Sequence, residues 1–302
     1  MITAGFAETG PEGAARQQEL LTRVRGHGMR MVGPNCMGLI DTSPAVRLAA
    51  TFAPIFPPHG PVAMLSQSGA LGVAILQFAE DLELGLSSFV SVGNKADVSA
   101  NDLLQYWEED PETSVILLYL ESFGNPRRFA PIARRVGRRK PVIAVKSGRS
   151  GAGRRAAGSH TASLAGSDVA VDALFSQTGM VRAETLEEMF HIALMLSSQP
   201  LPTGPRVAVL TTAGGPGILV ADALERNGLA VEPLPSALQE ELMRFLPVEA
   251  TATNPVDMIA SAGPAEYRRA AERLLASPDV DALIVIDVPL DEAQWSAIEP
   301  EL

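Results

Sequence analysis

"PVAMLSQSGALGVAILQFAEDL", residues 61–82, joins a short apolar run to a helical pattern through a turn of small residues. The alternation continues with apolar runs at 86–93, 114–123 and 140–148 and helical patterns at 100–110 and 126–139. Short apolar strands separated by helices are typical of βαβ units, and their unbroken apolar character indicates a parallel, buried sheet. The stretch therefore predicts a doubly wound parallel-sheet α/β domain over residues 58–199.

A second α/β domain is predicted at residues 205–302. The segment "SSQPLPTGPR", residues 197–206, concentrates Pro, Ser and Gly between two periodic regions and indicates a domain boundary. After it come the strand pattern "RVAVLTT", the glycine turn "AGGPG", a helical pattern and later the apolar strand "DALIVIDVP" at 281–289. The strand–turn–helix pattern of the first domain thus starts again.

Both ends of the chain lack parts of a complete sheet. Residues 1–45 offer a loop, a helix at 12–28, a short strand "MRMVG" at 29–33 and the turn "GPNCMG" at 33–38, too little to close a sheet. At the other end the second sheet has just begun when the sequence stops. We expect residues 1–45 to be the C-terminal remnant of one domain and residues 205–302 to be truncated at their C-terminus.

Composition excludes several classes of protein. The formal net charge of -11 argues against general nucleic-acid binding, which depends on Lys and Arg neutralising phosphates. Cys36 is the only cysteine, so no internal disulfide or multi-cysteine metal site forms, and we predict no metal site. No run approaches the apolar length of a membrane span, and the N-terminus lacks a signal-peptide pattern. We expect a cytoplasmic protein that binds neither nucleic acid nor membrane.

One region carries a local excess of positive charge. Residues 122–167 contain no Asp or Glu, although the chain as a whole is acidic. Such an excess attracts a multiply charged anion, but between 127 and 140 it equally fits an arginine-rich helix face in solvent. The basic residues are Arg127, Arg128, Arg134, Arg135, Arg138, Arg139, Lys140, Lys146, Arg149, Arg154 and Arg155.

Three turns combine a preceding strand, small residues and a following helix. This geometry directs free backbone N–H groups and the positive end of a helix at an anion, although such glycines also serve simply to let the backbone turn. None matches a P-loop or a complete dinucleotide fingerprint. The candidate phosphate-binding residues are Ser66, Ser68 and Gly69 in the first turn, Gly214, Gly215 and Gly217 in the second, and Gly158, Ser159 and His160 in the third.

His160 is a candidate nucleophile. An imidazole nitrogen can accept a phosphoryl group, and helix N-termini can hold the oxygens of that group. Such a histidine needs a carboxylate that fixes its tautomer, and Glu121 follows the apolar strand "VILLYL" at the edge where ligands gather in parallel sheets. The alternatives are a solvated loop histidine and a surface glutamate at a strand end.

The motifs "GPNCMGL", "LSQSGALG", "SVGNKADVSANDLLQYWEEDPET", "LYLESF", "SGRSGAGRRAAGSHTASLAGSD" and "TTAGGPGILVADALE", in this order, resemble those of the NDP-forming acyl-CoA synthetases. These enzymes are relatives of succinyl-CoA ligase. The resemblance covers nearly the whole chain. It implies two flavodoxin-like domains, preceded by the C-terminal part of a Rossmann-like CoA-binding domain.

The resemblance also implies a role for individual residues. His160 matches the histidine that is phosphorylated, and Glu121 matches the carboxylate that hydrogen-bonds it. Ser68 and Gly69 match the phosphate-holding helix start of the ligase domain, while Gly215 and Gly217 match its counterpart in the second domain. The turn "GPNCMG" would place Asn35 and Cys36 near the thiol end of CoA, although a buried packing role for Cys36 is the commoner fate of such a residue.

The same resemblance implies cofactors and partners. The expected ones are CoA, a small carboxylic acid or its acyl-CoA, and ADP/ATP or GDP/GTP with Mg²⁺. The nucleotide would bind an ATP-grasp subunit or domain, and we expect an oligomer. This sequence departs from the pattern of the family in two respects. It lacks the N-terminal glycine turn that cradles CoA in the family, and it lacks the ATP-grasp half. A non-catalytic CoA- or acyl-CoA-sensing module, such as the regulatory region of a protein acyltransferase, and a flavin or nicotinamide protein are the alternatives.

Overall fold

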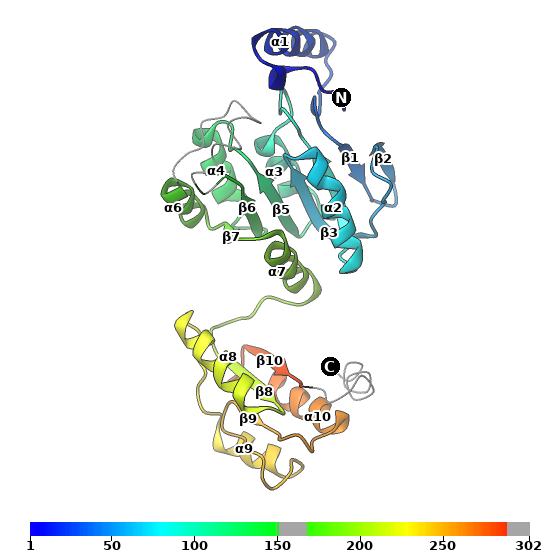
Figure 1. The fold of residues 1–302 in the computed structure, drawn as a ribbon. Coiled ribbons are helices and arrows are strands. Elements are labelled where there is room, and N and C mark those ends of the chain that lie inside the picture. Colours follow the sequence, from blue (N-terminus) through cyan, green and yellow to red (C-terminus); the bar gives the residue numbers. More distant parts are fainter. Residues whose placement is uncertain (149, 151–167, 289–302) are drawn as a thin grey trace. The chain divides into compact units, whose positions relative to one another are not determined.

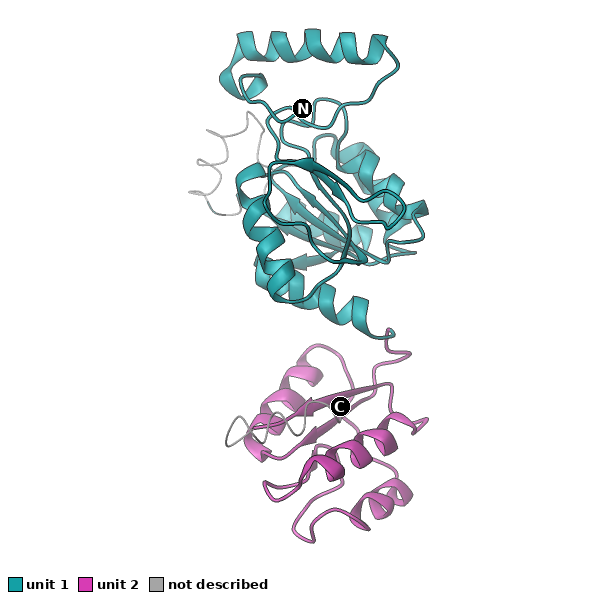
Figure 2. Cartoon of the chain, turned by 90° about the vertical axis from the view of Figure 1, so that its right-hand side faces the viewer, with its two compact units in different colours: residues 1–200 teal, residues 201–302 magenta. Residues whose placement is uncertain are grey.

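The computed structural model describes residues 1–148, 150 and 168–288. The chain divides into two compact units, Met1–Pro200 and Leu201–Leu302, which Figure 2 shows in different colours. This division places the boundary within the predicted linker at 197–206.

The first unit contains both a large sheet and the helices that cover it. Its elements in chain order are η1 (Ala7–Thr9), α1 (Pro11–Gly26), β1 (Gly38–Asp41), β2 (Leu48–Thr51), β3 (His59–Ser66), α2 (Gly69–Asp81), β4 (Leu86–Ser91), α3 (Ala100–Glu109), β5 (Val115–Leu120), α4 (Pro126–Val136), β6 (Val142–Lys146), α6 (Asp168–Thr178), β7 (Val181–Ala183) and α7 (Leu186–Ser198). Figure 1 shows α1 standing apart from the sheet.

The strands of the first unit form one seven-stranded sheet in the order β2-β1-β4-β3-β5-β6-β7. From β4 to β7 every neighbouring pair is parallel. Helices α3, α4 and α6 cover one face, and α2 and α7 cover the other (Figure 1). Because both faces are covered, strands such as β6 are buried throughout, as their unbroken apolar sequences predict. The predicted doubly wound α/β fold is confirmed.

The front of the chain differs from the prediction. β1 pairs antiparallel with both β2 and β4, so this part of the predicted segment 1–45 extends the large sheet. Residues 29–33 are not a strand, and that prediction is wrong. Their hydrogen bonds go to the last turn of α1, to the N-terminal ammonium, to the loop 96–98 and to the Asp97 carboxylate, so these residues pair with no strand. The division into domains 1–45, 58–199 and 205–302 stays a prediction.

The second unit holds a three-stranded parallel sheet in the order β10-β8-β9. Leu210 and Val256 face a cluster with α9 and α10, whereas Val209 packs with α8 on the other side. The sheet is therefore covered on both faces within the described residues. Its elements are β8 (Val207–Thr211), α8 (Gly214–Arg226), α9 (Ser236–Met243), β9 (Val256–Asp257), α10 (Pro264–Leu275) and β10 (Ala282–Ile286).

The basic run on and after α4 makes local contacts with the end of α3. Glu108 has a buried side chain, and Arg135 holds its carboxylate with bonds of 2.9 and 2.7 Å. Arg139 adds an ion pair to Glu109 at 3.1 Å. Lys140 donates to two backbone carbonyls, those of Trp107 and Asp110. These contacts favour a structural role for this part of the positive charge.

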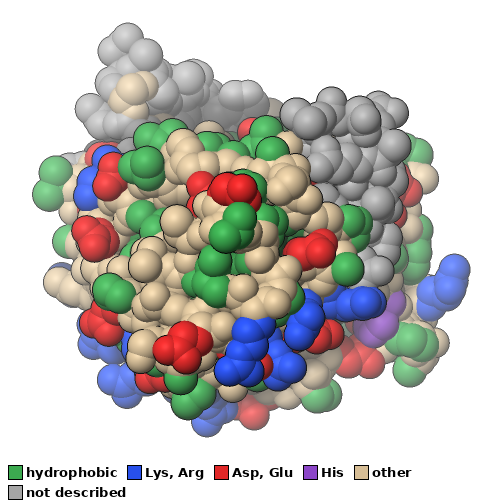
Figure 3. Space-filling model, turned by 90° about the horizontal axis from the view of Figure 1, so that it is seen from below, with side chains coloured by type: hydrophobic (Ala, Val, Ile, Leu, Met, Phe, Trp, Pro, Cys, Tyr) green, Lys and Arg blue, Asp and Glu red, His purple; other side chains and the backbone are tan. Residues whose placement is uncertain are grey.

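The surface carries charges of both signs (Figure 3), although the chain has a formal net charge of -11. On the face shown in Figure 3, acidic and basic side chains occur side by side, among hydrophobic and polar ones. Within the described part of the chain, no helix combines the length and the apolar character that crossing a membrane requires.

Candidate active site at the carboxyl edge of the first sheet

The parallel strands of the first unit end together at one edge of the sheet. Because β3, β5 and β6 run in the same direction and are neighbours, the residues that follow them converge there. Ser66 and Gln67 lie at the end of β3, Glu121 follows β5, and Lys146 ends β6. The sequence analysis predicts the candidate carboxylate, Glu121, at this edge.

Helix α2 begins at this edge with a well-formed cap. The Ser68 hydroxyl accepts a hydrogen bond from the Leu71 N–H at 3.3 Å, so Ser68 is the N-cap and Gly69 the first helical residue. Ser66 fixes the turn before it, since its hydroxyl donates to the Ser68 carbonyl at 2.7 Å. The first N–H groups of a helix have no intrahelical partner, and with the helix dipole they favour an anion at this position.

Gln67 connects this turn to Glu121. Its side-chain oxygen accepts from the backbone N–H groups of Glu121 at 2.8 Å and Ser122 at 2.9 Å. Its amide nitrogen donates to the Ser122 carbonyl at 2.7 Å. One buried side chain therefore makes three hydrogen bonds and holds the turn that carries Glu121 beside the start of α2.

The predicted CoA turn packs directly on the same helix start. A Cβ added at Gly69 would lie 3.3 Å from the Met37 nitrogen and 3.5 Å from the Cys36 carbonyl carbon. In the loop after β4, a Cβ at Gly93 would lie 2.1 Å from the Asn35 carbonyl oxygen. Glycine at both positions lets three backbone segments meet. The structure thus brings Asn35, Cys36, Ser68, Gly69 and Glu121 into one region.

The Cys36 side chain is a packed thiol. It is 4% exposed, and its Sγ lies 3.4 Å from the Met1 carbonyl oxygen. Burial raises the pKa of this thiol, which keeps it protonated and unreactive. This agrees with the packing role considered for it, whereas a role of the turn near CoA stays a prediction.

Two lysines at this edge carry no sequence signal of their place in the site: Lys95, which is half-buried, and Lys146, which is buried. Lys95, on the loop after β4, donates to the Ser122 hydroxyl and, at 3.4 Å, to the Ser122 carbonyl. Lys146 is only 7% exposed and donates to the Ser147 carbonyl. Lys146 appeared in the sequence only as part of the basic excess. Lys95 falls within the motif "SVGNKAD", yet a lysine in a loop carries no signal of its own burial.

The predicted phosphohistidine loop lies outside the described residues. This holds for Gly158, Ser159 and His160, as well as for Arg149, Arg154 and Arg155. Their predicted roles therefore stay predictions. The described residues on either side of the segment, Lys146 at the end of β6 and Asp168 at the start of α6, belong to the first unit.

The second unit repeats the strand–turn–helix geometry at the end of β8. Thr211 fixes the turn as Ser66 does in the first unit, since its hydroxyl donates to the Ala213 carbonyl at 3.0 Å. Helix α8 begins at Gly214, and a Cβ there would lie 3.0 Å from an Asp257 carboxylate oxygen. Around Gly215 there is open space, whereas a Cβ at Gly217 would lie 3.1 Å from the Thr211 methyl carbon.

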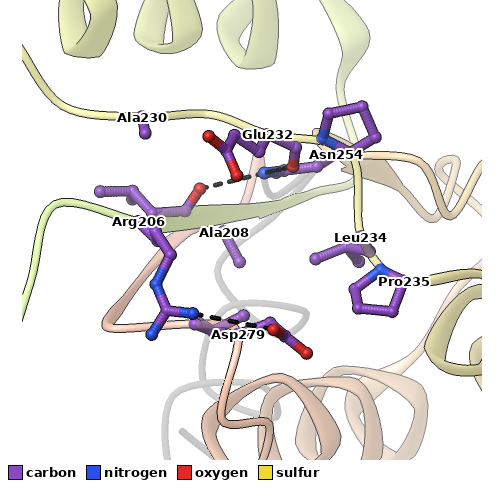
Figure 4. A pocket seen from close by; sticks show the side chains of 11 residues that line it. Arg206, Ala208, Ala230, Glu232, Leu234, Pro235, Asn254 and Asp279 are labelled. Atoms are coloured by element: carbon purple, nitrogen blue, oxygen red, sulfur yellow. Dashed lines mark hydrogen bonds and ion pairs between the residues drawn. The ribbon is translucent and has the colours of Figure 1, made fainter.

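A small pocket of about 100 Å³ in the second unit lies at the opposite, amino end of β8 (Figure 4). Its arginine, Arg206, is already paired with Asp281 through bonds of 2.9 and 2.8 Å. Asn254 lines the pocket but donates to the Val207 and Glu232 carbonyls. The polar groups here satisfy one another, so we assign this pocket no part in the site.

Comparison with known proteins agrees with this geometry. Residues 59–196 match the family described as "Succinyl-CoA ligase like flavodoxin domain", and residues 207–288 match "Ligase-CoA domain". The alpha subunit of the ADP-forming acetate–CoA ligase II of Pyrococcus furiosus is 47% identical over 288 residues, which are 95% of this chain and 62% of the relative. The chain belongs to the succinyl-CoA ligase-like family of NDP-forming acyl-CoA synthetases.

Other members of this family of NDP-forming acyl-CoA synthetases are also similar. The ADP-forming 4-hydroxybutyrate–CoA ligase of Nitrosopumilus maritimus is 35% identical, covering 96% of this chain and 42% of the relative. The solved structure of acetyl-coenzyme A synthetase 1 from Ca. Korarchaeum cryptofilum, in complex with phosphate and ADP, superimposes with a TM-score of 0.91 at 40% identity. The superposition covers 100% of this chain and 66% of the Ca. Korarchaeum cryptofilum chain. The chain thus spans less than two thirds of the length of these relatives.

Proposed function

We propose that this chain is the ligase portion of an NDP-forming acyl-CoA synthetase. The reaction is the reversible conversion of acyl-CoA, NDP and phosphate to carboxylic acid, CoA and NTP. One observation carries the proposal: Gly69, at the capped start of α2, packs on the Cys36–Met37 backbone while Gln67 holds Glu121 beside it. The predicted CoA turn, phosphate site and carboxylate are therefore neighbours.

The central step is phosphoryl transfer from an acyl phosphate to His160. The unprotonated imidazole nitrogen forms a bond to phosphorus as the bond from phosphorus to the acyl oxygen breaks. That oxygen leaves with the electron pair as a carboxylate. Glu121 accepts the hydrogen bond of the other ring nitrogen, fixing the tautomer and stabilising the charge that develops. Ser68 and Gly69, with Gly158 and Ser159 beside the histidine, hold the phosphoryl oxygens.

A preceding step links the acyl phosphate to CoA. In the direction of acyl-CoA use, a phosphate oxygen bonds to the acyl carbon while the carbon–sulfur bond breaks, and the thiolate of CoA leaves and takes up a proton. The turn of Asn35 and Cys36 lies beside the start of α2, so a thiol end bound there would be close to phosphate on the helix N-terminus. This proximity supports a CoA-binding role for both residues.

The second transfer, from phosphohistidine to a nucleoside diphosphate, requires an ATP-grasp subunit or domain. The similar alpha subunit of Pyrococcus furiosus and the longer relatives support such a partner. Gly215 and Gly217, in the first turn of α8, are the phosphate-binding residues that we propose in the second unit. Mg²⁺ would accompany the nucleotide. We place this oligomeric enzyme in the cytoplasm.

The acyl group is a small carboxylic acid. The similar proteins are named for acetate and for 4-hydroxybutyrate, so the acid differs among the relatives. Acetyl phosphate is therefore the first substrate to test.

The test is phosphorylation of the chain by acetyl [³²P]phosphate. We expect an acid-labile, base-stable label, which is the behaviour of a phosphoramidate. His160→Ala should abolish the label. His191→Ala is the matched control, because His191 is an exposed histidine on α7, and this variant should be labelled like the wild type.

A label that persists in His160→Ala would contradict the assignment of the nucleophile. In a second step, ADP and an ATP-grasp subunit from a relative are added to the labelled wild type. We expect the label to leave the protein and ATP to form. CoA binding by calorimetry without any phosphoryl exchange would instead support the sensing module.

A further inference from the structure

Lys95 crosses the carboxyl edge of the sheet. Its loop follows β4, yet its ammonium bonds the hydroxyl and the carbonyl of Ser122, which follows β5. Strand β3 lies between β4 and β5 in the sheet, so the Lys95 side chain reaches past the end of β3. The contact adds to the three hydrogen bonds with which Gln67 holds the turn of Glu121 and Ser122.

The backbone of the Lys95 loop is fixed on its other side by the turn of Asn35. Asn94 donates from its backbone to the Pro34 carbonyl at 2.9 Å, and Ala96 donates to the Gly33 carbonyl at 3.2 Å. Lys95 itself has a φ of +55°, a left-handed conformation that few non-glycine residues adopt. The loop is therefore held between the predicted CoA turn and the turn that carries Glu121.

The charges around Lys95 come from each neighbouring strand end. Burial lowers the pKa of the Lys95 ammonium to about 8, while the negative charge of Glu121 raises it and the positive charge of Lys146 lowers it further. Burial also lowers the pKa of Lys146, against the opposing effects of Glu121 and Asp168 and together with that of Arg182. The charge of Glu121 thus acts on both lysines.

We propose that Lys95 is a positioning residue for phosphoryl transfer: its ammonium ties the loop after β4 to Ser122 and so fixes the turn of Glu121 and the charge beside it. This inference rests on the proposed function. Protonated Lys95 offers three donors and carries a positive charge beside the turn of Glu121 and Ser122. The neutral amine loses the charge, so the hydrogen bond to Ser122 weakens and the carboxylate is less well held.

The experiment measures the rate of labelling by acetyl [³²P]phosphate in a single turnover, across a pH range on both sides of the pKa of Lys95. The full chain is used as wild type, Lys95→Met and Lys95→Arg. Lys140→Met is the matched control, because Lys140 also donates to two backbone carbonyls but precedes β6, at the opposite edge of the sheet. Fluorescence of the buried Trp107 checks that each variant is folded at every pH.

We expect the wild-type rate to fall as the pH rises through about 8, where Lys95 loses its proton. Lys95→Met should label about 10- to 100-fold more slowly and lack this fall, since small misplacements of catalytic groups have effects of that size. Lys95→Arg should keep most of the rate and show the fall only at higher pH, because guanidinium stays charged. Lys140→Met should keep the wild-type pH profile.

Two results would overturn the inference while leaving the proposed function intact. One is a folded Lys95→Met variant with the wild-type rate and pH profile, and the other is a Lys95→Arg variant whose rate falls at the wild-type pH. A wild-type chain that acetyl phosphate does not label at any pH would overturn the proposed function and this inference together.

Discussion

The Gln67 side chain holds the backbone N–H of Glu121 with a hydrogen bond of 2.8 Å. Two strands that are separated in sequence by two helices and a strand are joined by this contact, at the edge where ligands bind in parallel sheets. The position of Glu121 is therefore set by β3 as well as by its own strand, β5.

Gln67→Met should loosen this edge. The methionine has a similar volume but leaves two backbone N–H groups and one carbonyl without their partner, so we expect a loss of about 2–4 kcal/mol in the free energy of unfolding. Labelling by acetyl phosphate should fall as well. Urea unfolding followed by tryptophan fluorescence measures the first effect. Gln77→Met, on the exposed side of α2, is the control and should differ little from the wild type.

Alanine should have opposite effects at two predicted phosphate-binding glycines. In Gly69→Ala the new methyl group lies 3.3 Å from the Met37 nitrogen, so the backbone of the predicted CoA turn must shift, and we expect a cost of about 1–3 kcal/mol. In Gly215→Ala it enters open space in the first turn of α8, where it should stabilise the helix by about 0.5 kcal/mol. Thermal unfolding followed by circular dichroism compares the two. Equal destabilisation would contradict the packing described for Gly69.

Asp97 should make the first unit sensitive to acid. Burial by itself would raise the pKa of Asp97, but hydrogen bonds from Arg30, Arg25 and the Met31 N–H outweigh it and hold the pKa at about 2, below the ordinary value of 3.8. The stability that Asp97 contributes is therefore fully present above pH 3.8 and is lost as the pH falls toward 2.

Asp97→Asn should remove this part of the acid sensitivity. It should also cost roughly 3 kcal/mol at neutral pH, because two arginines lose their carboxylate partner. Urea unfolding at a series of pH values measures both effects. The exposed Asp81→Asn serves as the control. An Asp97→Asn variant with the wild-type pH dependence would show that another carboxylate is responsible.

Asn254 should be irreplaceable in the second unit. Its side-chain oxygen accepts from the Val209 N–H at 2.9 Å, and its nitrogen donates to the Val207 carbonyl at 3.0 Å, as the peptide group of a neighbouring strand would. Asn254→Ala should therefore destabilise the second unit by about 2–4 kcal/mol. Asn254→Asp keeps the acceptor but places a negative charge beside the Val207 carbonyl, so it should not restore stability. Hydrogen exchange of the β8 amides reports on this unit alone.

The sequence by itself determined the architecture of both units, because strand and helix periodicity are local properties of a chain. Apolar runs such as 114–123 and the helical pattern at 100–110 lie close to β5 and α3 as the structure has them. The turn of Ser68 and the strand-end position of Glu121 followed from the same local order. The motifs also identified the family.

Tertiary structure decided which of these residues meet and which charges are buried. The antiparallel addition of β1 and β2, the packing of Gly69 on the turn of Cys36, and the contacts of Gln67 and Lys95 with residues after β5 all join segments distant in sequence. Residues 29–33 look like a strand locally, but their partners include a loop and the carboxylate of Asp97. Burial and pairing depend on the whole fold, so no local pattern contains them.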